Sequence, residues 1–222
     1  MIVKGAIFDM DGTIIDSLSF WGRIWPRIGA HFLGDPDFRP SEEVEMRLRT
    51  MLLDEAIAYF GEACHIPATR EELIDFTKAD LIEFYKTVAT VKEGAGELLA
   101  ALQAAGIPIV LASATEGDVI RIVLAHHGLD AFFCRVLSCV DVGAGKDKPD
   151  IYLESAAGMG LSPEEVCVFE DSLVALQTAR AAGFHTVGIF DSHTPGQDAI
   201  RAAADLAYIP EGESLLAALA GL

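Results

Sequence analysis

The sequence contains few cysteines and no long apolar run. None of its four cysteines belongs to a Cys-x-x-Cys pair, and its histidines and cysteines lack zinc-like spacing, so neither a disulfide framework nor a zinc site is expected. No stretch approaches the roughly 18 consecutive apolar residues of a membrane-spanning helix, and no cleavable leader precedes the first strand-like run. We therefore expect a soluble, cytoplasmic protein without membrane partners, whose thiols are reduced and buried.

Basic side chains are also scarce. Sixteen lysines and arginines stand against 34 aspartates and glutamates, which gives a net charge of −18. Such a charge repels nucleic-acid backbones and anionic lipid surfaces, so neither is expected as a partner. Because 51% of the 222 residues are hydrophobic, the chain can build a sizeable core, which excludes a disordered protein. We expect a monomer or a weak homodimer.

The segment AIFDMDGTI at residues 6–14 carries the clearest chemical signal. Its apolar start continues a run from Ile2 and is typical of a buried strand in a parallel sheet, whose carboxyl end is where ligands bind in open α/β sheets. Asp9 and Asp11, two positions apart, point the same way if the chain is still extended. Their repulsion favours one ionised and one protonated carboxyl, as a nucleophile beside a general acid requires. Taken alone, the same residues also suit an ordinary turn.

The next stretch, from about residue 16 to residue 90, is helical in pattern throughout. Thr69 and Glu72 form a capping box for one helix, and Gly61 is expected to end the helix that starts at residue 54. Ser41 can cap another helix. The apolar face of that helix carries Val44, Leu48 and Met51. We interpret residues 16–90 as an inserted, all-helical cap with its own core, sitting above the carboxyl end of the first strand.

From residue 91 onward, helices alternate with short apolar runs. The expected strands are 107–112, 135–138, 166–169 and 186–190, with 208–209 as a candidate edge strand. This alternation predicts an α/β fold with a doubly wound parallel sheet. Residues 1–15 and 91–222 should form this core, and the alanine-rich tail after residue 199 should be a surface helix.

Polar side chains follow three of the predicted strands. They are Asp9, Asp11, Ser113, Glu170 and Asp171. The carboxyl ends of parallel strands share one edge, so these groups should meet in one crevice. Several carboxylates with free oxygens suit a hard cation such as Mg²⁺, which also takes a substrate phosphate oxygen as a ligand.

Groups suited to an anion accompany these carboxylates. Ser113 offers a hydroxyl, the N–H groups after it can point at a phosphate, and a lysine of the loop 146–148 can bind one. Each group also has a simpler interpretation, since Ser113 and residues 170–172 can cap the helices that follow them and loop lysines are commonly solvated. Convergence at one sheet edge favours a shared site.

The order of these motifs resembles the haloacid dehalogenase-like (HAD) hydrolase superfamily. The motifs are DMDGTIIDS at 9–17, LASAT at 111–115, Lys146 with Pro149-Asp150, and FEDS at 169–172. The most similar branch has a helical cap inserted after the first motif and includes phosphoglycolate phosphatases and β-phosphoglucomutases. The resemblance implies a Rossmann-like HAD core and a Mg²⁺-dependent phosphatase acting on a small phosphomonoester, such as a sugar phosphate or similar metabolite.

The resemblance also implies roles for single residues. Asp9 would attack phosphorus and become an aspartyl phosphate, and Asp11 would protonate the leaving oxygen and then activate water. Ser113 and Lys146 would hold the phosphoryl group, and closure of the cap would exclude water.

The metal site is implied in the same way. Mg²⁺ would be held by the Asp9 carboxylate, the main-chain carbonyl of Asp11 and Asp171, with Glu170 as a direct or water-mediated ligand.

The phosphate-binding lysine departs from the family pattern. In the family it commonly stands four residues before the aspartate of a Lys-Pro-x-Pro-Asp stretch. Lys146 has this spacing from Asp150, but Asp147 replaces the proline, whereas Lys148 directly precedes the remaining proline. We favour Lys146 and keep Lys148 as the alternative.

Two other functions are compatible with these residues. A phosphohexomutase similar to β-phosphoglucomutase would use the same aspartyl phosphate but return the phosphoryl group to a sugar. A receiver-like phospho-acceptor or other binding module would also cluster carboxylates, a hydroxyl and a lysine, but receivers lack the helical insertion and an acid two residues beyond the phospho-acceptor. Because Asp9 and Asp11 are both present, catalysis is the leading interpretation.

Overall fold

The computed structural model describes residues 3–48 and 53–222. Ile2, expected in the first strand, and Met51, expected on a cap helix, lie outside these ranges. Within them, every helix is too short or too polar to cross a lipid bilayer.

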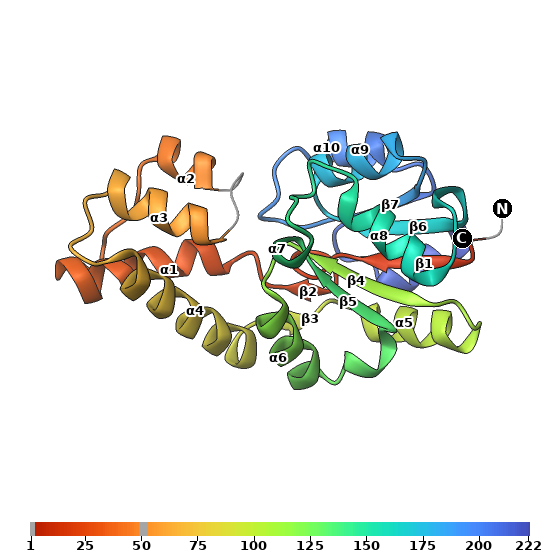
Figure 1. Ribbon diagram of the computed structural model, residues 1–222, viewed down its shortest axis with the longest axis horizontal. Helices are drawn as coiled ribbons and strands as arrows, with labels where there is room; N and C mark the ends of the chain where they lie inside the picture. Colours follow the sequence, from red (N-terminus) through yellow and green to blue (C-terminus); the bar gives the residue numbers. More distant parts are fainter. Residues whose placement is uncertain (1–2, 49–52) are drawn as a thin grey trace. The chain divides into compact units, whose positions relative to one another are not determined.

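The chain divides into two compact units (Figure 1). One consists of Met1–Leu18 and Ala89–Leu222, and the other of Ser19–Val88. The first is an α/β unit, whereas the described residues of the second form helices and their connections.

A six-stranded parallel sheet forms the centre of the α/β unit, in the order β5-β4-β1-β6-β7-β8. The strands are β1 (Gly5–Phe8), β4 (Ile109–Ser113), β5 (Arg135–Ser138), β6 (Val166–Glu170), β7 (His185–Ile189) and β8 (Ala207–Ile209). Strands β1, β4 and β6 are buried along their whole length, which explains why their sequences are continuously apolar rather than alternating. The predicted doubly wound α/β fold is confirmed.

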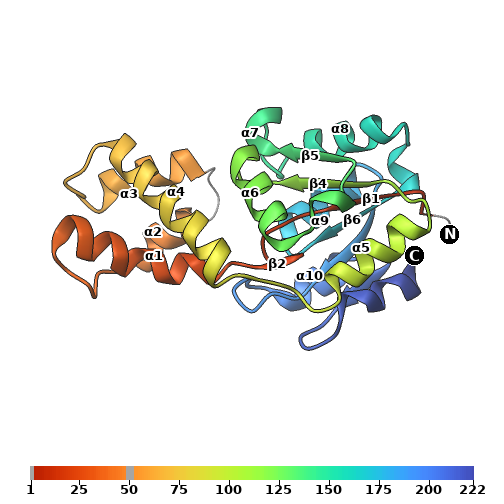
Figure 2. The same cartoon turned by 90° about the horizontal axis from the view of Figure 1, so that it is seen from below.

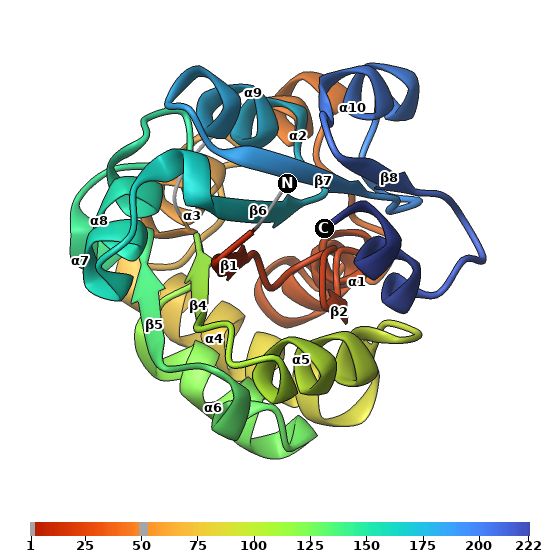
Figure 3. The same cartoon turned by 90° about the vertical axis from the view of Figure 1, so that its right-hand side faces the viewer.

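Helices cover both faces of this sheet. One face packs against α8 (Asp150–Met159), α9 (Leu173–Ala181) and α10 (Gln197–Ala203), as Figure 3 shows. The other packs against α5 (Ala95–Ala104), α6 (Gly117–His127) and the 3₁₀ helix η4 (Leu215–Gly221), and Figure 2 looks onto α5 and α6. The short elements η2 (Asp130–Phe132), α7 (Cys139–Val142) and η3 (Pro163–Glu165) complete the unit.

The carboxyl ends of β1 and β6 are held together by an aromatic stack. Phe8 and Phe169 are register partners in the two strands, and their rings stack with centroids 4.1 Å apart. Both side chains are fully buried. The next residue along each strand is an acid, so the stack lies directly behind Asp9 and Glu170.

A two-stranded antiparallel ribbon connects the helical unit to the α/β unit. It consists of β2 (Ile15–Asp16) and β3 (Thr90–Val91), with Asp16 paired to Thr90. The expectation that residues 16–90 are entirely helical was therefore wrong at both ends. Strands of two residues are too short to show a period in the sequence.

The helical unit contains α1 (Phe20–Ile28), the π-helix η1 (Gly29–Leu33), α2 (Glu42–Leu48), α3 (Leu53–Ala63) and α4 (Arg70–Thr87). The capping box of Thr69 and Glu72 is present at the start of α4. Gly61 does not end α3, because the helix continues to Ala63. A Cβ on Gly61 would lie 2.8 Å from the side chain of Leu73, so this glycine allows α3 and α4 to pack closely.

Smaller differences concern the ends of strands and the thiols. Strand β4 begins at Ile109 rather than 107, because Pro108 has no N–H for the ladder. The tail after residue 199 is not one surface helix, since β8 separates α10 from η4. All four cysteines are free, but Cys134 is exposed and Cys64 half-buried, so only the other two meet the expectation of buried thiols.

Candidate active site

Three carboxylates meet at the carboxyl edge of the sheet. Asp9 follows β1, Glu170 ends β6 and Asp171 comes next, and the two strands are neighbours. One oxygen from each carboxylate lies within 4.8 Å of the others. The three residues are only 6%, 1% and 5% exposed, so these charges are largely removed from water.

Lys146 is the lysine that the structure brings to this cluster. Its Nζ pairs with Asp9 Oδ1 and lies 2.5 Å from Glu170 Oε1. Burial disfavours the charged ammonium, but the two carboxylates outweigh burial and raise the pKa of Lys146 above its usual range. Lys148, in contrast, is exposed.

Burial and repulsion from neighbouring carboxylates disfavour the ionised forms of Asp9 and Asp171. Burial, together with the charges of Glu170, Asp171 and Asp11, raises the pKa of Asp9 well above its ordinary value, although Lys146 opposes this shift. Burial and the charge of Glu170 raise the pKa of Asp171 to about 7, against the opposing hydrogen bond from Thr194.

This donor set fits a hard divalent cation. Three carboxylates face one ammonium group, so negative charge remains in excess when all of them are ionised. A cation of the Mg²⁺ type binds through carboxylate oxygens and would neutralise this excess.

The carboxylate of Asp11 is held apart from the metal-ligating candidates. Ser17 Oγ donates a hydrogen bond to Asp11 Oδ1 at 2.6 Å, and Thr115 Oγ1 donates one to Asp11 Oδ2 at 2.8 Å. Asp11 is half-buried. In the first motif, the carboxylate of Asp9 thus lies in the acidic cluster, whereas that of Asp11 is bound by two hydroxyl groups.

A tight turn allows this arrangement. The backbone of Gly12 has a φ of +78°, and a Cβ on it would lie 2.7 Å from Asp171 Oδ2. The amide N–H groups of Thr13, Ile14 and Ile15 all donate to the carbonyl of Met10. The turn interpretation of this motif is therefore correct in its geometry, and the turn also forms one side of the acidic site.

Ser113 is the last residue of β4, the strand beside β1. It is buried, and its Oγ accepts a hydrogen bond from the Thr115 N–H at 3.1 Å. The helix α6 begins only at Gly117 with Glu116 as its N-cap residue, so the alternative that Ser113 caps this helix was wrong. Its hydroxyl shapes the loop that also carries Thr115 to Asp11.

Two contacts to the cluster were missed in the sequence. The hydroxyl of Tyr152, on α8, donates to Glu170 Oε1 at 3.1 Å. Thr194, in the loop after β7, donates from Oγ1 to Asp171 Oδ2 at 2.6 Å. Neither residue belongs to a motif, and only the packing of α8 and the course of the loop bring them to the site.

Comparison with known proteins decides the family. A family model described as haloacid dehalogenase-like hydrolase matches residues 3–183. The chain belongs to this family. The resemblance seen in the four motifs is therefore confirmed, together with the expectation of an enzyme.

The curated relatives of this HAD protein include phosphatases and a β-phosphoglucomutase of Mycobacterium tuberculosis, which is 26% identical over 211 residues and covers 83% of this chain and 80% of the relative. The chain is 29% identical over 189 residues to fructose-1-phosphate phosphatase YqaB of Escherichia coli, a match that covers 83% of this chain and 95% of the relative. It is 30% identical over 190 residues to hexitol phosphatase A of the same organism, with 85% and 84% covered. Among solved structures, a Thermotoga maritima protein provisionally assigned as a β-phosphoglucomutase matches with a TM-score of 0.79 and 25% identity, covering 98% of each chain.

Proposed function

We propose that this protein is a Mg²⁺-dependent phosphatase that hydrolyses a small phosphomonoester, such as a sugar phosphate, through an aspartyl phosphate on Asp9. The observation that carries the proposal is the buried cluster of Asp9, Glu170 and Asp171 with Lys146 at the carboxyl edge of the sheet. Phosphoryl transfer depends mainly on positioning and on neutralising charge, and this cluster supplies groups for both.

The reaction takes two displacements at phosphorus. A carboxylate oxygen of Asp9 attacks, a bond from Asp9 to phosphorus forms, and the bond from phosphorus to the ester oxygen breaks. Asp11 gives its proton to the leaving oxygen, which departs as an alcohol. Asp11 then takes a proton from water, whose oxygen attacks the aspartyl phosphate, so that inorganic phosphate leaves and Asp9 is restored.

The other groups of the site hold charge and geometry. Mg²⁺, when bound through Asp9, Asp171, the main-chain carbonyl of Asp11 and Glu170 directly or through water, supplies positive charge to the phosphoryl oxygens. Lys146 contributes a second positive charge, and Ser113 offers a hydroxyl at the next strand end. The Asp11 carboxylate lies outside the metal-ligating set, which suits a group that must exchange protons.

The relatives support a sugar phosphate or a related polyol phosphate as substrate, because their names are fructose-1-phosphate phosphatase and hexitol phosphatase A. In this proposal residues 16–90 act as the cap that selects the substrate and excludes water. A phosphohexomutase is the second candidate, favoured by the likeness to the Thermotoga maritima protein.

Phosphate release from a panel of sugar phosphates, phosphoglycolate, nucleotides and an aryl phosphate, with and without Mg²⁺, tests the proposal. We expect metal-dependent turnover in the wild type, its loss in Asp9→Asn, and its retention in the control Asp147→Asn, which changes an exposed aspartate of the Lys146 loop. Acid quenching during turnover should trap protein that carries one phosphoryl group. Interconversion of hexose phosphates without phosphate release would indicate the mutase. The absence of both activities would overturn both candidate functions.

A further inference from the structure

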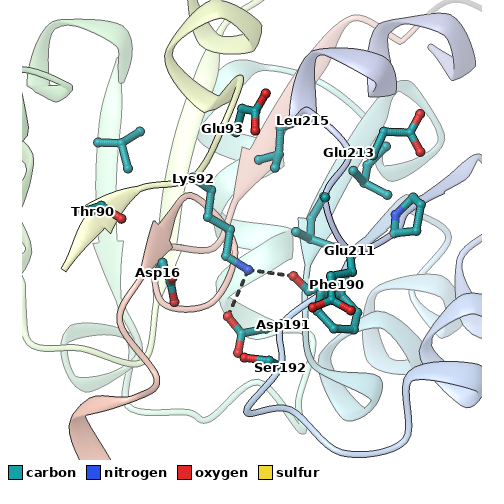
Figure 4. A pocket seen from close by; sticks show the side chains of 15 residues that line it. Asp16, Thr90, Lys92, Glu93, Phe190, Asp191, Ser192, Glu211, Glu213 and Leu215 are labelled. Carbon is teal, nitrogen blue, oxygen red and sulfur yellow. Dashed lines mark hydrogen bonds and ion pairs between the residues drawn. The ribbon is translucent and has the colours of Figure 1, made fainter.

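The loop of residues 190–196 connects β7 to α10 and carries Thr194 to the acidic cluster. One end of this loop borders a cavity of about 330 Å³, whose lining includes Lys92, Asp191 and Ser192 (Figure 4). Lys92 follows β3 of the connecting ribbon and reaches across this cavity to the loop. The loop therefore contacts both Lys92 and Asp171.

Lys92 anchors the start of the loop. Its Nζ donates to the carbonyl of Phe190 at 2.7 Å and pairs with Asp191 Oδ2 at 2.9 Å. The side chains of Lys92 and Asp191 are only 12% and 2% exposed, so the pair is screened weakly by solvent.

The loop is also closed by a hydrogen bond within it and by the side chain of Gln197, the first residue of α10. Asp191 Oδ1 accepts from the His193 N–H at 2.8 Å. The side-chain Nε2 of Gln197 donates to the carbonyls of Asp191 and Thr194 at 2.8 and 2.7 Å. The hydroxyl of Tyr208 donates to Gln197 Oε1 at 2.8 Å. With these bonds in place, the Thr194 hydroxyl is not needed to close the loop.

The Thr194 hydroxyl instead binds the carboxylate of Asp171. It donates to Asp171 Oδ2 at 2.6 Å, and the other oxygen, Oδ1, accepts a long hydrogen bond from Thr13 at 3.4 Å. Each carboxylate oxygen has two lone pairs, so a hydrogen bond fixes the rotation of the group while leaving positions for a metal ion.

We propose that Thr194 is a positioning residue that orients Asp171 for Mg²⁺, and that Lys92, Asp191 and Gln197 hold the loop that presents it. The inference rests on the proposed function, because it takes Asp171 as a metal ligand. It adds a residue outside the four motifs to the metal site.

Binding of Mg²⁺ to the metal-free protein, measured by titration calorimetry, tests this inference without relying on turnover. We expect Thr194→Val, which removes the hydroxyl but keeps the shape, to weaken binding about 10- to 100-fold, as loss of a hydrogen bond to a metal ligand typically does. Thr194→Ser keeps the hydroxyl and should bind as the wild type does. Ser192→Ala, an exposed residue of the same loop, is the matched control and should leave binding unchanged.

Urea denaturation of the same variants separates positioning from folding. A lower midpoint for Thr194→Val with unchanged Mg²⁺ affinity would show a structural role only and overturn the inference, while leaving the proposed function in place. If the wild type itself does not bind Mg²⁺, both fall. Should Thr194→Val not fold, Gln197→Met loosens the loop by removing the bonds to the Asp191 and Thr194 carbonyls, and wild-type affinity in that variant would equally overturn the inference.

Discussion

Replacing Lys146 with methionine should destabilise the metal-free protein strongly. The substitution removes the ammonium group that pairs with Asp9 and Glu170 and keeps a side chain of similar length. The two carboxylates would remain, with side chains only 8% and 1% exposed, and Asp171 would still lie within 4.8 Å of them.

The expected loss follows from the burial of these partners. Removing one partner of a buried ion pair typically costs about 3–5 kcal/mol, because the other charge is left uncompensated in a poorly solvated site. For a chain of this size, that loss corresponds to a decrease in Tm of roughly 6–20 °C. Saturating Mg²⁺ should restore part of the loss, since a divalent cation also neutralises the carboxylates.

Equilibrium urea denaturation at pH 8 with a chelator present measures this effect. Lys148→Met is the matched control, since Lys148 is exposed two positions away, and its free energy of unfolding should stay within about 0.5 kcal/mol of the wild type. Equal losses in the two variants, or no loss in Lys146→Met, would refute the assignment of Lys146 to the cluster.

Three further predictions concern the turn, the metal site and the helical unit. Gly12→Ala should reduce stability by more than the roughly 1 kcal/mol expected from a positive φ alone, because its Cβ would meet Asp171. Gly34→Ala is the control, since its Cβ has open space and only the strain of a φ of +68° remains. Thermal denaturation compares the stability of the two variants. The raised pKa of Asp171, about 7, means that its carboxyl keeps a proton at lower pH, so Mg²⁺ affinity should fall as the pH falls below about 7; calorimetry at pH 6 and pH 8 checks the sign, and stronger binding at pH 6 would contradict it. Thr69→Ala removes the side chain that caps α4 and should cost about 1 kcal/mol in urea denaturation, while Thr69→Ser should cost less.

The sequence contained strong signals for the core and for the acids. Strands β1, β4 and β6 are buried on both faces, so their apolar runs are continuous and easily detected. Because parallel strands end at one edge, the acids after two of them could be expected to meet. The location of Asp9, Glu170 and Asp171 directly after predicted strands was therefore enough to predict that they are neighbours.

Other contacts depend on loop geometry that no periodicity encodes. The choice between Lys146 and Lys148 rested on spacing alone, and only the course of the loop after α7 shows which Nζ reaches Asp9. Thr194 approaches Asp171 because its loop is held by Lys92, which is distant in the sequence, and by the nearby Gln197. Ribbon β2–β3 was missed because two residues per strand are too few for a pattern.

The stack of Phe8 on Phe169 has a consequence for how this protein could diversify. Neighbouring strands lie about 4.8 Å apart, and the stack accompanies the parallel pairing that places Phe8 opposite Phe169, so the acids that follow these two residues leave the sheet side by side. The spacing between Asp9 and Glu170 is thus an internal property of the α/β unit and owes nothing to the sequence of Ser19–Val88. If the helical unit selects the substrate, as proposed above, substitutions there can change specificity while the α/β unit keeps the geometry of the acids.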